Sequence, residues 1–181
     1  MFPEIENSLL VIVDVQQKLM NVMNENAVCL GRVRLLANAC SLMDVPCIVT
    51  EQYPKGLGPT VDAVREILKE NTPFIEKSAF LCCGADEFNQ KILEADRKNI
   101  ILCGVESHVC VLQTAVALLN KGYNVILAAD AVSSRNENDK MTALAYMRHA
   151  GISVLSTESI IFALLKDSRH PAFKAVSALL K

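Results

Sequence analysis

Short apolar runs alternate with longer amphipathic stretches along almost the whole chain. The run Leu9–Val13 is continuous and apolar, which is typical of a strand buried on both faces of a parallel sheet. Other stretches place apolar residues at helical spacing, as at Val33, Leu36 and Cys40. The pattern predicts six strands, at Leu9–Val13, Cys47–Thr50, Phe74–Lys77, Asn99–Cys103, Asn124–Ala129 and Ile152–Leu155.

The segments between the strands read as helices with recognisable ends. Thr60 suits an N-cap, glycines at 122 and 151 suit helix stops, and Pro171 suits a first helical position. The predicted helices are Ala27–Met43, Thr60–Glu70, Asp86–Lys98, Val109–Lys121, Asp139–Ala150, Thr157–Leu165 and Pro171–Leu180. Alternating strands and helices imply parallel pairing with right-handed crossovers, and therefore an open α/β sheet covered on both faces. We expect one domain spanning residues 1–181.

Charge and hydropathy exclude two classes of partner. The 18 basic and 20 acidic side chains are interspersed, and even the basic stretch Lys91–Lys98 contains Glu94 and Asp96. Nucleic-acid binding relies on neutralising phosphates, so this balance argues against such a partner. No apolar run approaches the roughly 20 residues that span a bilayer, so we expect no membrane partner.

The seven cysteines favour a reducing compartment. Their number is odd and they form no paired CxxC arrangement, so free thiols are expected rather than disulfides or a zinc site. The segment Met1–Ser8 carries Glu4 and Glu6 and no basic residue, unlike a secretory or mitochondrial leader. We expect a cytoplasmic protein, with an organellar location left open.

Residues with catalytic chemistry follow several of the predicted strands. In an open parallel sheet, ligands bind outside the carboxyl ends of the strands, where the strand order reverses. Asp14 ends the first strand, Lys77 ends the third, and Cys110 follows the fourth at the start of a helix. Thr50 and Glu51 end the second strand and Asp130 ends the fifth. A carboxylate, an ammonium group and a thiol are therefore expected to converge at one edge.

Each of these three residues has a catalytic and a structural interpretation. A helix start and a nearby lysine would favour the thiolate of Cys110, whereas a buried core thiol would be inert. Asp14 suits a general base or a side chain that caps the following turn, and Lys77 suits a charge partner or a solvated lysine. Together they favour catalysis, because a thiol needs a base and a thiolate beside a carboxylate needs a cation.

The motifs around these residues resemble the isochorismatase-like cysteine hydrolases, and most closely the short isochorismatase-domain proteins. The resemblance is carried by Leu10–Gln16, by Lys77 and, most specifically, by Gly104–Ala115. It implies a three-layer αβα sandwich with a six-stranded parallel sheet in the order 3-2-1-4-5-6. It also implies a catalytic triad of Asp14, Lys77 and Cys110. By the same resemblance, a cis peptide joins Val105 to Glu106, and the backbone N–H groups of Glu106 and Cys110 form an oxyanion hole.

Two departures from the family narrow the expected chemistry. Nicotinamidases of this family carry a metal site with an Asp-x-His element after the second strand. Here that region reads Glu51-Gln52-Tyr53-Pro54, and the histidines are His108, His149 and His170. We therefore expect no metal and no other cofactor. Isochorismatases proper cleave a vinyl ether without a nucleophilic cysteine, so Cys110 argues against that reaction.

The sequence therefore predicts a cysteine hydrolase that acts on a small amide or related carbonyl compound through a thioester. Residues expected to shape its pocket are Gln17, Gln52, Tyr53 and Leu81, with Ser133 from a later loop. One enzymatic alternative uses His108 as the base of a Cys–His pair. A second alternative is an oligomeric binding or scaffold protein of the same fold with little or no turnover. A nuclease is less favoured because of the charge balance.

The resemblance also implies a homo-oligomer. The apolar segment Ile160–Leu165 suits either a subunit interface or a helix that faces the core.

Overall fold

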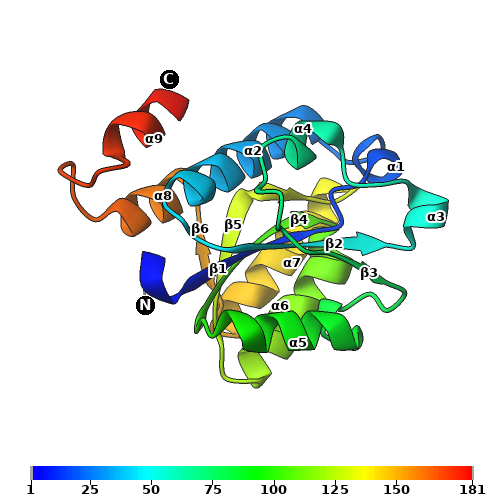
Figure 1. The fold of residues 1–181 in the computed structure, drawn as a ribbon. Coiled ribbons are helices and arrows are strands. Elements are labelled where there is room, and N and C mark those ends of the chain that lie inside the picture. Colours follow the sequence, from blue (N-terminus) through cyan, green and yellow to red (C-terminus); the bar gives the residue numbers. More distant parts are fainter. Residues whose placement is uncertain (1, 181) are drawn as a thin grey trace.

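The computed structural model describes residues 2–180 and contains a six-stranded sheet in the order β3-β2-β1-β4-β5-β6 (Figure 1). The strands are β1 (Ser8–Val13), β2 (Cys47–Gln52), β3 (Phe74–Lys77), β4 (Asn99–Val105), β5 (Asn124–Ser133) and β6 (Ser153–Leu155). All five neighbouring pairs are parallel. The predicted α/β class and strand order are confirmed.

The two central strands explain the most apolar stretches of the sequence. Every residue of β1 and of β4 is buried, because each strand has a neighbour on both sides and helices over both faces. After β1 the chain builds β2 and β3 on one side, then returns to place β4 on the other side of β1. The strand order therefore reverses between β1 and β4, where a crevice at the carboxyl ends is expected.

Helices cover both faces of the sheet and complete the three layers (Figure 1). α2 (Asn26–Leu42), α4 (Asp62–Arg65), α8 (Thr157–Leu165) and α9 (Phe173–Leu179) lie on one side; α5 (Asp86–Ala95), α6 (Leu112–Asn120) and α7 (Glu137–His149) lie on the other. Short α1 (Gln17–Met20) and α3 (Pro54–Leu57) follow β1 and β2. Single turns occur at Ile5–Asn7, Cys82–Gly84 and Ser107–Val111, the last of which is π-helical and leads into α6.

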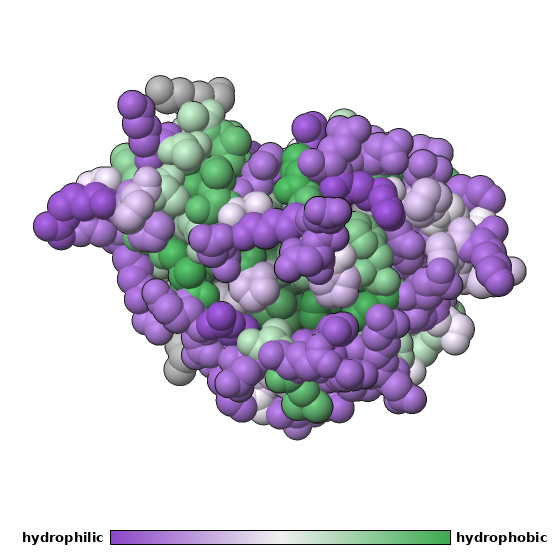
Figure 2. Space-filling view, viewed as in Figure 1, coloured by the Kyte–Doolittle hydropathy of each residue, from purple (hydrophilic) through white to green (hydrophobic). Residues whose placement is uncertain are grey.

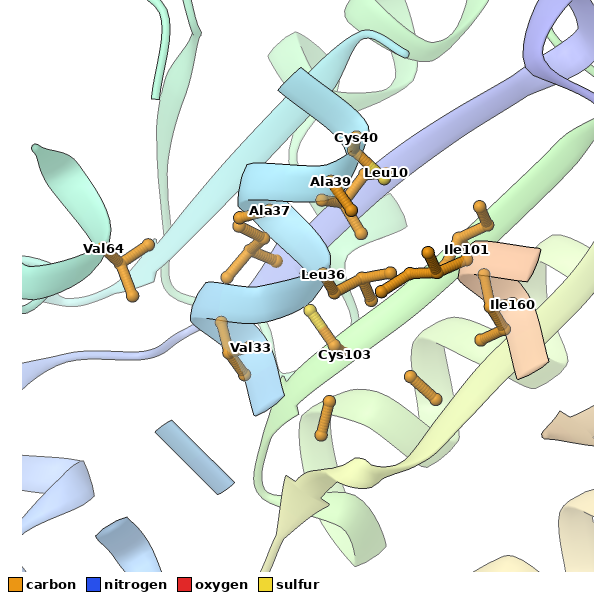
Figure 3. Close-up of a cluster of buried hydrophobic side chains, with 14 of the residues drawn as sticks. Leu10, Val33, Leu36, Ala37, Ala39, Cys40, Val64, Ile101, Cys103 and Ile160 are labelled. Atoms are coloured by element: carbon orange, nitrogen blue, oxygen red, sulfur yellow. The ribbon is translucent and has the colours of Figure 1, made fainter. Parts of the chain in front are cut away.

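The core on the α2 face is built from helical and strand residues that interdigitate. Figure 3 shows Leu36 and Cys40 of α2 packed over Leu10 of β1 and Ile101 of β4, with Ile160 of α8 beside them. All five residues are at most 1% exposed. A second buried cluster fills the opposite face beneath α5, α6 and α7. The two layers hold the strand ends in fixed positions.

One predicted helix is wrong in length and in its cap. The segment predicted as Thr60–Glu70 forms only the four-residue helix α4, whose N-cap is Val61. Thr60 is buried instead, and both its backbone N–H and its Oγ1 donate to Oε1 of Glu51 at 2.7 Å. A buried carboxylate is costly unless it accepts hydrogen bonds, so Thr60 donates to Glu51 and does not act as the N-cap that the local sequence predicts.

The fifth strand is longer than predicted, which removes Asp130 from the strand end. β5 continues to Ser133 through an irregularity opposite Leu102 and Gly104. Asp130 therefore lies inside β5, where its Oδ1 accepts hydrogen bonds from the backbone N–H and Oγ1 of Thr157, both at 2.7 Å. Its role is to hold the start of α8.

The apolar segment Ile160–Leu165 belongs mainly to the core. Ile160, Ile161, Leu164 and Leu165 are buried, whereas Phe162 is 44% exposed. The last helix, predicted from Pro171, begins at Phe173. Figure 2 shows that hydrophilic residues cover most of this face and that hydrophobic residues gather in patches, one of them over α8 and α9. Among residues 2–180, no helix combines the length and apolar character that crossing a membrane requires.

Candidate active site

Asp14 and Lys77 form a buried ion pair at the carboxyl edge of the sheet. Oδ2 of Asp14 lies 2.7 Å from Nζ of Lys77, and both side chains are 0% exposed. Asp14 follows β1 with a left-handed φ of 52°, and its backbone N–H donates to the carbonyl of Thr50 at 3.1 Å. Lys77 ends β3, so the pair reaches across β2.

Lys77 is surrounded by further oxygen acceptors. Its Nζ donates to Oε1 of Gln52 at 2.6 Å and to the carbonyls of Phe80 at 3.1 Å and Ala79 at 3.3 Å. Burial opposes the charged form of Lys77, but Asp14 and the nearby thiols outweigh it, so the pKa of Lys77 is raised. The ammonium group is therefore charged at neutral pH and gives the site a fixed positive centre.

Cys110 lies in the π-helical turn Ser107–Val111, on the other side of the point where the strand order reverses. The preceding bond between Val105 and Glu106 is cis. Cys110 is 7% exposed. Burial, and then the Asp14 carboxylate, raise the pKa of the Cys110 thiol to about 12, against the opposing charge of Lys77.

The helix start and Lys77 favour the thiolate of Cys110, but burial and the Asp14 charge outweigh them. Interaction with the Asp14 carboxylate thus opposes loss of the thiol proton. The thiol is protonated at neutral pH, and the Asp14 carboxylate acts on it electrostatically. The site thus brings together a thiol, a carboxylate and an ammonium group, which are the kinds of group that thiol catalysis uses.

Two polar residues in the site were not assigned a role from the sequence. Thr50 donates from Oγ1 to Oδ1 of Asp14 at 2.7 Å. The Cys82 thiol lies 3.7 Å from Thr50 Oγ1 and donates to it. Thr50 was placed at a strand end, but its partner depends on the left-handed turn at Asp14. No sequence spacing around Cys82 indicates that its turn folds back on β2.

Gln16 is a third residue that the sequence analysis missed. It is 0% exposed, and its Nε2 donates to the carbonyls of Gln52 at 3.0 Å and Gly58 at 2.6 Å. Its Oε1 accepts from the backbone N–H of Gln52 at 2.7 Å. Gln16 therefore fixes the loop after β2 beside the loop after β1.

The residues expected to shape the pocket occupy different positions. Gln52 contacts Lys77 directly, as described above. Tyr53 is 61% exposed, and its ring lies over Gly56, where a Cβ atom would come within 2.4 Å of it. Gln17 is exposed beside Gly58, and Leu81 immediately precedes the Cys82–Gly84 turn. Gln52 thus contacts the buried ion pair through its side chain, and Tyr53 contacts Lys77 through its backbone N–H, which donates to the Lys77 carbonyl at 3.0 Å.

Ser133 ends β5, and His108 lies in the π-helical turn after β4. Oγ of Ser133 donates to the carbonyl of Asn24 at 2.6 Å, which ties β5 to the segment before α2. Nδ1 of His108 lies 2.9 Å from Oγ of Ser134, and its Nε2 lies 4.0 Å from Oδ2 of Asp139. Both ring nitrogens of His108 therefore have neighbours other than Cys110.

Comparison with known proteins identifies the family. The Isochorismatase domain matches residues 8–159, a span that contains Asp14, Lys77 and Cys110. The chain belongs to the isochorismatase family. Isochorismatase family protein 1A of Dictyostelium discoideum is 41% identical over 175 residues, covering 95% of this chain and 85% of that protein. The resemblance inferred from the motifs is confirmed.

Solved structures give the same fold. The MAR1 ribonuclease of Caenorhabditis elegans matches with a TM-score of 0.95 and 39% identity, over 99% of this chain and 92% of that one. The YcaC protein of Escherichia coli, described as an octameric hydrolase of unknown specificity, matches with a TM-score of 0.94 and 21% identity, over 99% and 89%. At that identity the second likeness shows the fold alone. The chain has the isochorismatase-family hydrolase fold.

Proposed function

We propose that this isochorismatase-family chain is a cysteine hydrolase that cleaves small amides or related carbonyl compounds. The observation that carries the proposal is the buried Asp14–Lys77 ion pair, whose two charges both act on the buried Cys110 thiol. Removing a carboxylate and an ammonium group from water is costly, and such a pair adds little net stability, which supports a functional role for it. Strongly coupled titratable groups at a strand-order reversal are a common mark of catalytic sites.

The proposed reaction begins with proton transfer from Cys110 to Asp14. The sulfur then attacks the substrate carbonyl carbon, and the resulting oxyanion accepts hydrogen bonds from the backbone N–H groups of Glu106 and Cys110. Asp14 returns the proton to the amine nitrogen as the C–N bond breaks, which leaves a thioester. Water attacks the thioester, its proton passes to Asp14, and the acid leaves while the Cys110 thiol is restored. Lys77 keeps its charge throughout and balances the negative charge of the site.

Asp14 is favoured over His108 as the base. The Asp14 carboxylate interacts electrostatically with the thiol, whereas the ring nitrogens of His108 lie near Ser134 and Asp139. Turnover should therefore be lost in Asp14→Asn and retained in His108→Ala. The reverse result would identify His108 as the general base.

RNA cleavage is a second candidate, because the Caenorhabditis elegans relative is described as a ribonuclease. The net charge of −2 and the interspersed acidic residues argue for a small substrate instead of a polyanion. A labelled single-stranded RNA belongs in the assay beside the amides. RNA cleavage that survives Cys110→Ala would separate that activity from the proposed site.

We further propose that the protein assembles as a homo-oligomer in a reducing compartment such as the cytoplasm. The exposed side chains of Phe2 and Phe162, next to a groove of about 670 Å³, support association between copies. All seven cysteines are free, which supports the compartment. Light scattering on the purified chain measures the number of copies.

A screen of small amides and esters tests the proposed function. Product release should require Cys110 and be unaffected in Cys83→Ala, a matched change at a partly buried thiol outside the triad. Circular dichroism verifies that both variants are folded. Full turnover in Cys110→Ala would exclude the mechanism. A folded wild type that turns over nothing in the panel, although it binds some of the compounds, would favour the binding or scaffold alternative.

A further inference from the structure

Buried polar groups form a chain of contacts behind the Asp14 carboxylate. Thr50 Oγ1 donates to Oδ1 of Asp14 at 2.7 Å, and the Cys82 thiol donates to Thr50 Oγ1 at 3.7 Å. The backbone N–H of Cys82 donates to Oγ1 of Thr114 at 2.9 Å. Thr50, Cys82 and Thr114 are each 0% exposed. Thr114 lies four residues after Cys110 in the same helical stretch, so the contacts lead back to the helix that carries the thiol.

The direction of these hydrogen bonds is fixed by chemistry. A threonine hydroxyl has one proton to donate, and an ionised carboxylate only accepts, so the proton of Thr50 points to Asp14. Burial, and then Asp14, raise the pKa of Cys82 to about 12, so Cys82 keeps its proton at neutral pH and acts as a donor. Because Cys82 donates to the Thr50 oxygen, the hydroxyl proton is directed away from the sulfur and toward the carboxylate.

We infer that Thr50 is a positioning residue for the Asp14–Cys110 pair and that Cys82 sets the direction of the Thr50 hydroxyl. The inference rests on the proposed function, since it concerns the base of that reaction. Thr50 holds Oδ1 of Asp14 while Lys77 holds Oδ2, so the carboxylate cannot turn away from the thiol without breaking a buried hydrogen bond.

The Thr50 hydroxyl also compensates part of the charge on Asp14. The titratable groups that interact with Asp14 are Lys77 from β3, Cys82 from the turn after β3 and Cys110 from the turn after β4. The Asp14 charge opposes ionisation of Cys110. Without the hydroxyl, that opposition becomes stronger and the thiolate forms less readily.

The test compares alkylation of Cys110 by iodoacetamide at pH 9 in the wild type, Thr50→Val and Thr50→Ser, followed by peptide mass spectrometry. Below the pKa of a thiol, each unit of upward shift slows alkylation tenfold, so we expect about three- to tenfold slower labelling in Thr50→Val. Thr50→Ser keeps the hydroxyl and should react at the wild-type rate. If Thr50 only filled space, valine would preserve the rate and serine would not.

A second pair of variants tests Cys82. Cys82→Ala removes the donor and lets the Thr50 hydroxyl turn, so we expect labelling of Cys110 to slow about twofold. Cys82→Ser keeps a donor and should restore the wild-type rate. Equal rates in wild type and Cys82→Ala would remove Cys82 from the inference.

The design separates this inference from the proposed function. Acylation of wild-type Cys110 by p-nitrophenyl acetate, measured on the same preparations, tests the nucleophile. Its absence would overturn the proposed function and, with it, the positioning role. Acylation of the wild type together with wild-type alkylation in Thr50→Val would overturn the inference alone. Thermal unfolding monitors folding, and Thr50→Ala replaces Thr50→Val in the comparison if the valine variant does not fold.

Discussion

Oδ2 of Asp14 and Nζ of Lys77 are 2.7 Å apart although the residues are separated by 63 positions in the chain. Both side chains are 0% exposed, so water does not screen their interaction. The pair links the ends of β1 and β3, which are not neighbours in the sheet. Removing one charge therefore leaves the other buried without its partner.

We predict that Lys77→Met lowers the free energy of unfolding by about 3 kcal/mol, because the Asp14 carboxylate stays buried and loses its cation. The double variant Asp14→Asn/Lys77→Met should regain part of that loss, since no buried charge remains. Urea denaturation at pH 7 measures both values.

The exposed pair Lys69–Asp44 provides a matched control. These side chains are 50% and 86% exposed, so Lys69→Met should leave the urea midpoint close to that of the wild type. Equal effects of Lys77→Met and Lys69→Met would contradict the burial argument.

Gly104 is required where β4 passes β1 at the candidate site. Its φ is +112°, and a Cβ atom would lie 2.1 Å from the carbonyl oxygen of Val13. We predict that Gly104→Ala destabilises the fold by about 3 kcal/mol or more. Gly31 in α2 has nothing within 4 Å of an added Cβ, so Gly31→Ala should stabilise the protein by roughly 0.5–1 kcal/mol. An unfolding temperature that falls in Gly104→Ala and rises in Gly31→Ala would confirm the prediction. Equal shifts of the unfolding temperature in the two variants would contradict it.

Because several cysteine thiols are buried, we predict that the free energy of unfolding decreases at alkaline pH. Burial raises the pKa of Cys40 from 9.0 to about 12, so the folded state keeps a proton that the unfolded state loses first. The resulting stability is complete below pH 9 and falls as pH rises toward 12. Each such thiol contributes a slope of up to about 1.4 kcal/mol per pH unit.

Denaturation of the wild type and of Cys40→Ala at several pH values above 9 measures this slope. The cavity in Cys40→Ala lowers stability at every pH, but its decline with pH should be shallower than that of the wild type. Parallel curves for the two proteins would show that Cys40 does not contribute.

The sequence predicted the sheet because its signals are local and strong. An apolar run such as Leu9–Val13 is buried on both faces in any parallel sheet, and the positions of Asp14 and Lys77 at strand ends follow from it. The helix predicted at 60–70 is shorter in the structure because Thr60 donates two hydrogen bonds to the Glu51 carboxylate instead of capping a helix. A local sequence pattern does not indicate that a buried carboxylate nearby needs hydrogen-bond donors. Prediction succeeded where neighbouring residues determine structure, and failed where a distant partner does.

In the candidate site too, local sequence predicted some residues, whereas the roles of others depend on tertiary contacts. Asp14 and Lys77 follow from strand ends, whereas the roles of Thr50 and Cys82 depend on turns that bring β1, β2 and the loop after β3 together. Helix position and a lysine favour the thiolate of Cys110, whereas burial raises the pKa of the thiol, and the sequence pattern did not decide which effect is larger. Burial depth is a property of the packed molecule and has no local sequence signal.

The central claim is that Cys110 forms the covalent intermediate. The most direct measurement is the reaction with p-nitrophenyl acetate, followed by p-nitrophenolate release and by acid-quenched peptide mapping that separates Cys110 from Cys82 and Cys83. The account predicts a burst of p-nitrophenolate, an acetyl group on Cys110 that hydroxylamine removes, and neither of these in Cys110→Ala. A burst of wild-type size in Cys110→Ala, or an acetyl group mapped to Cys82 or Cys83 instead, would contradict it.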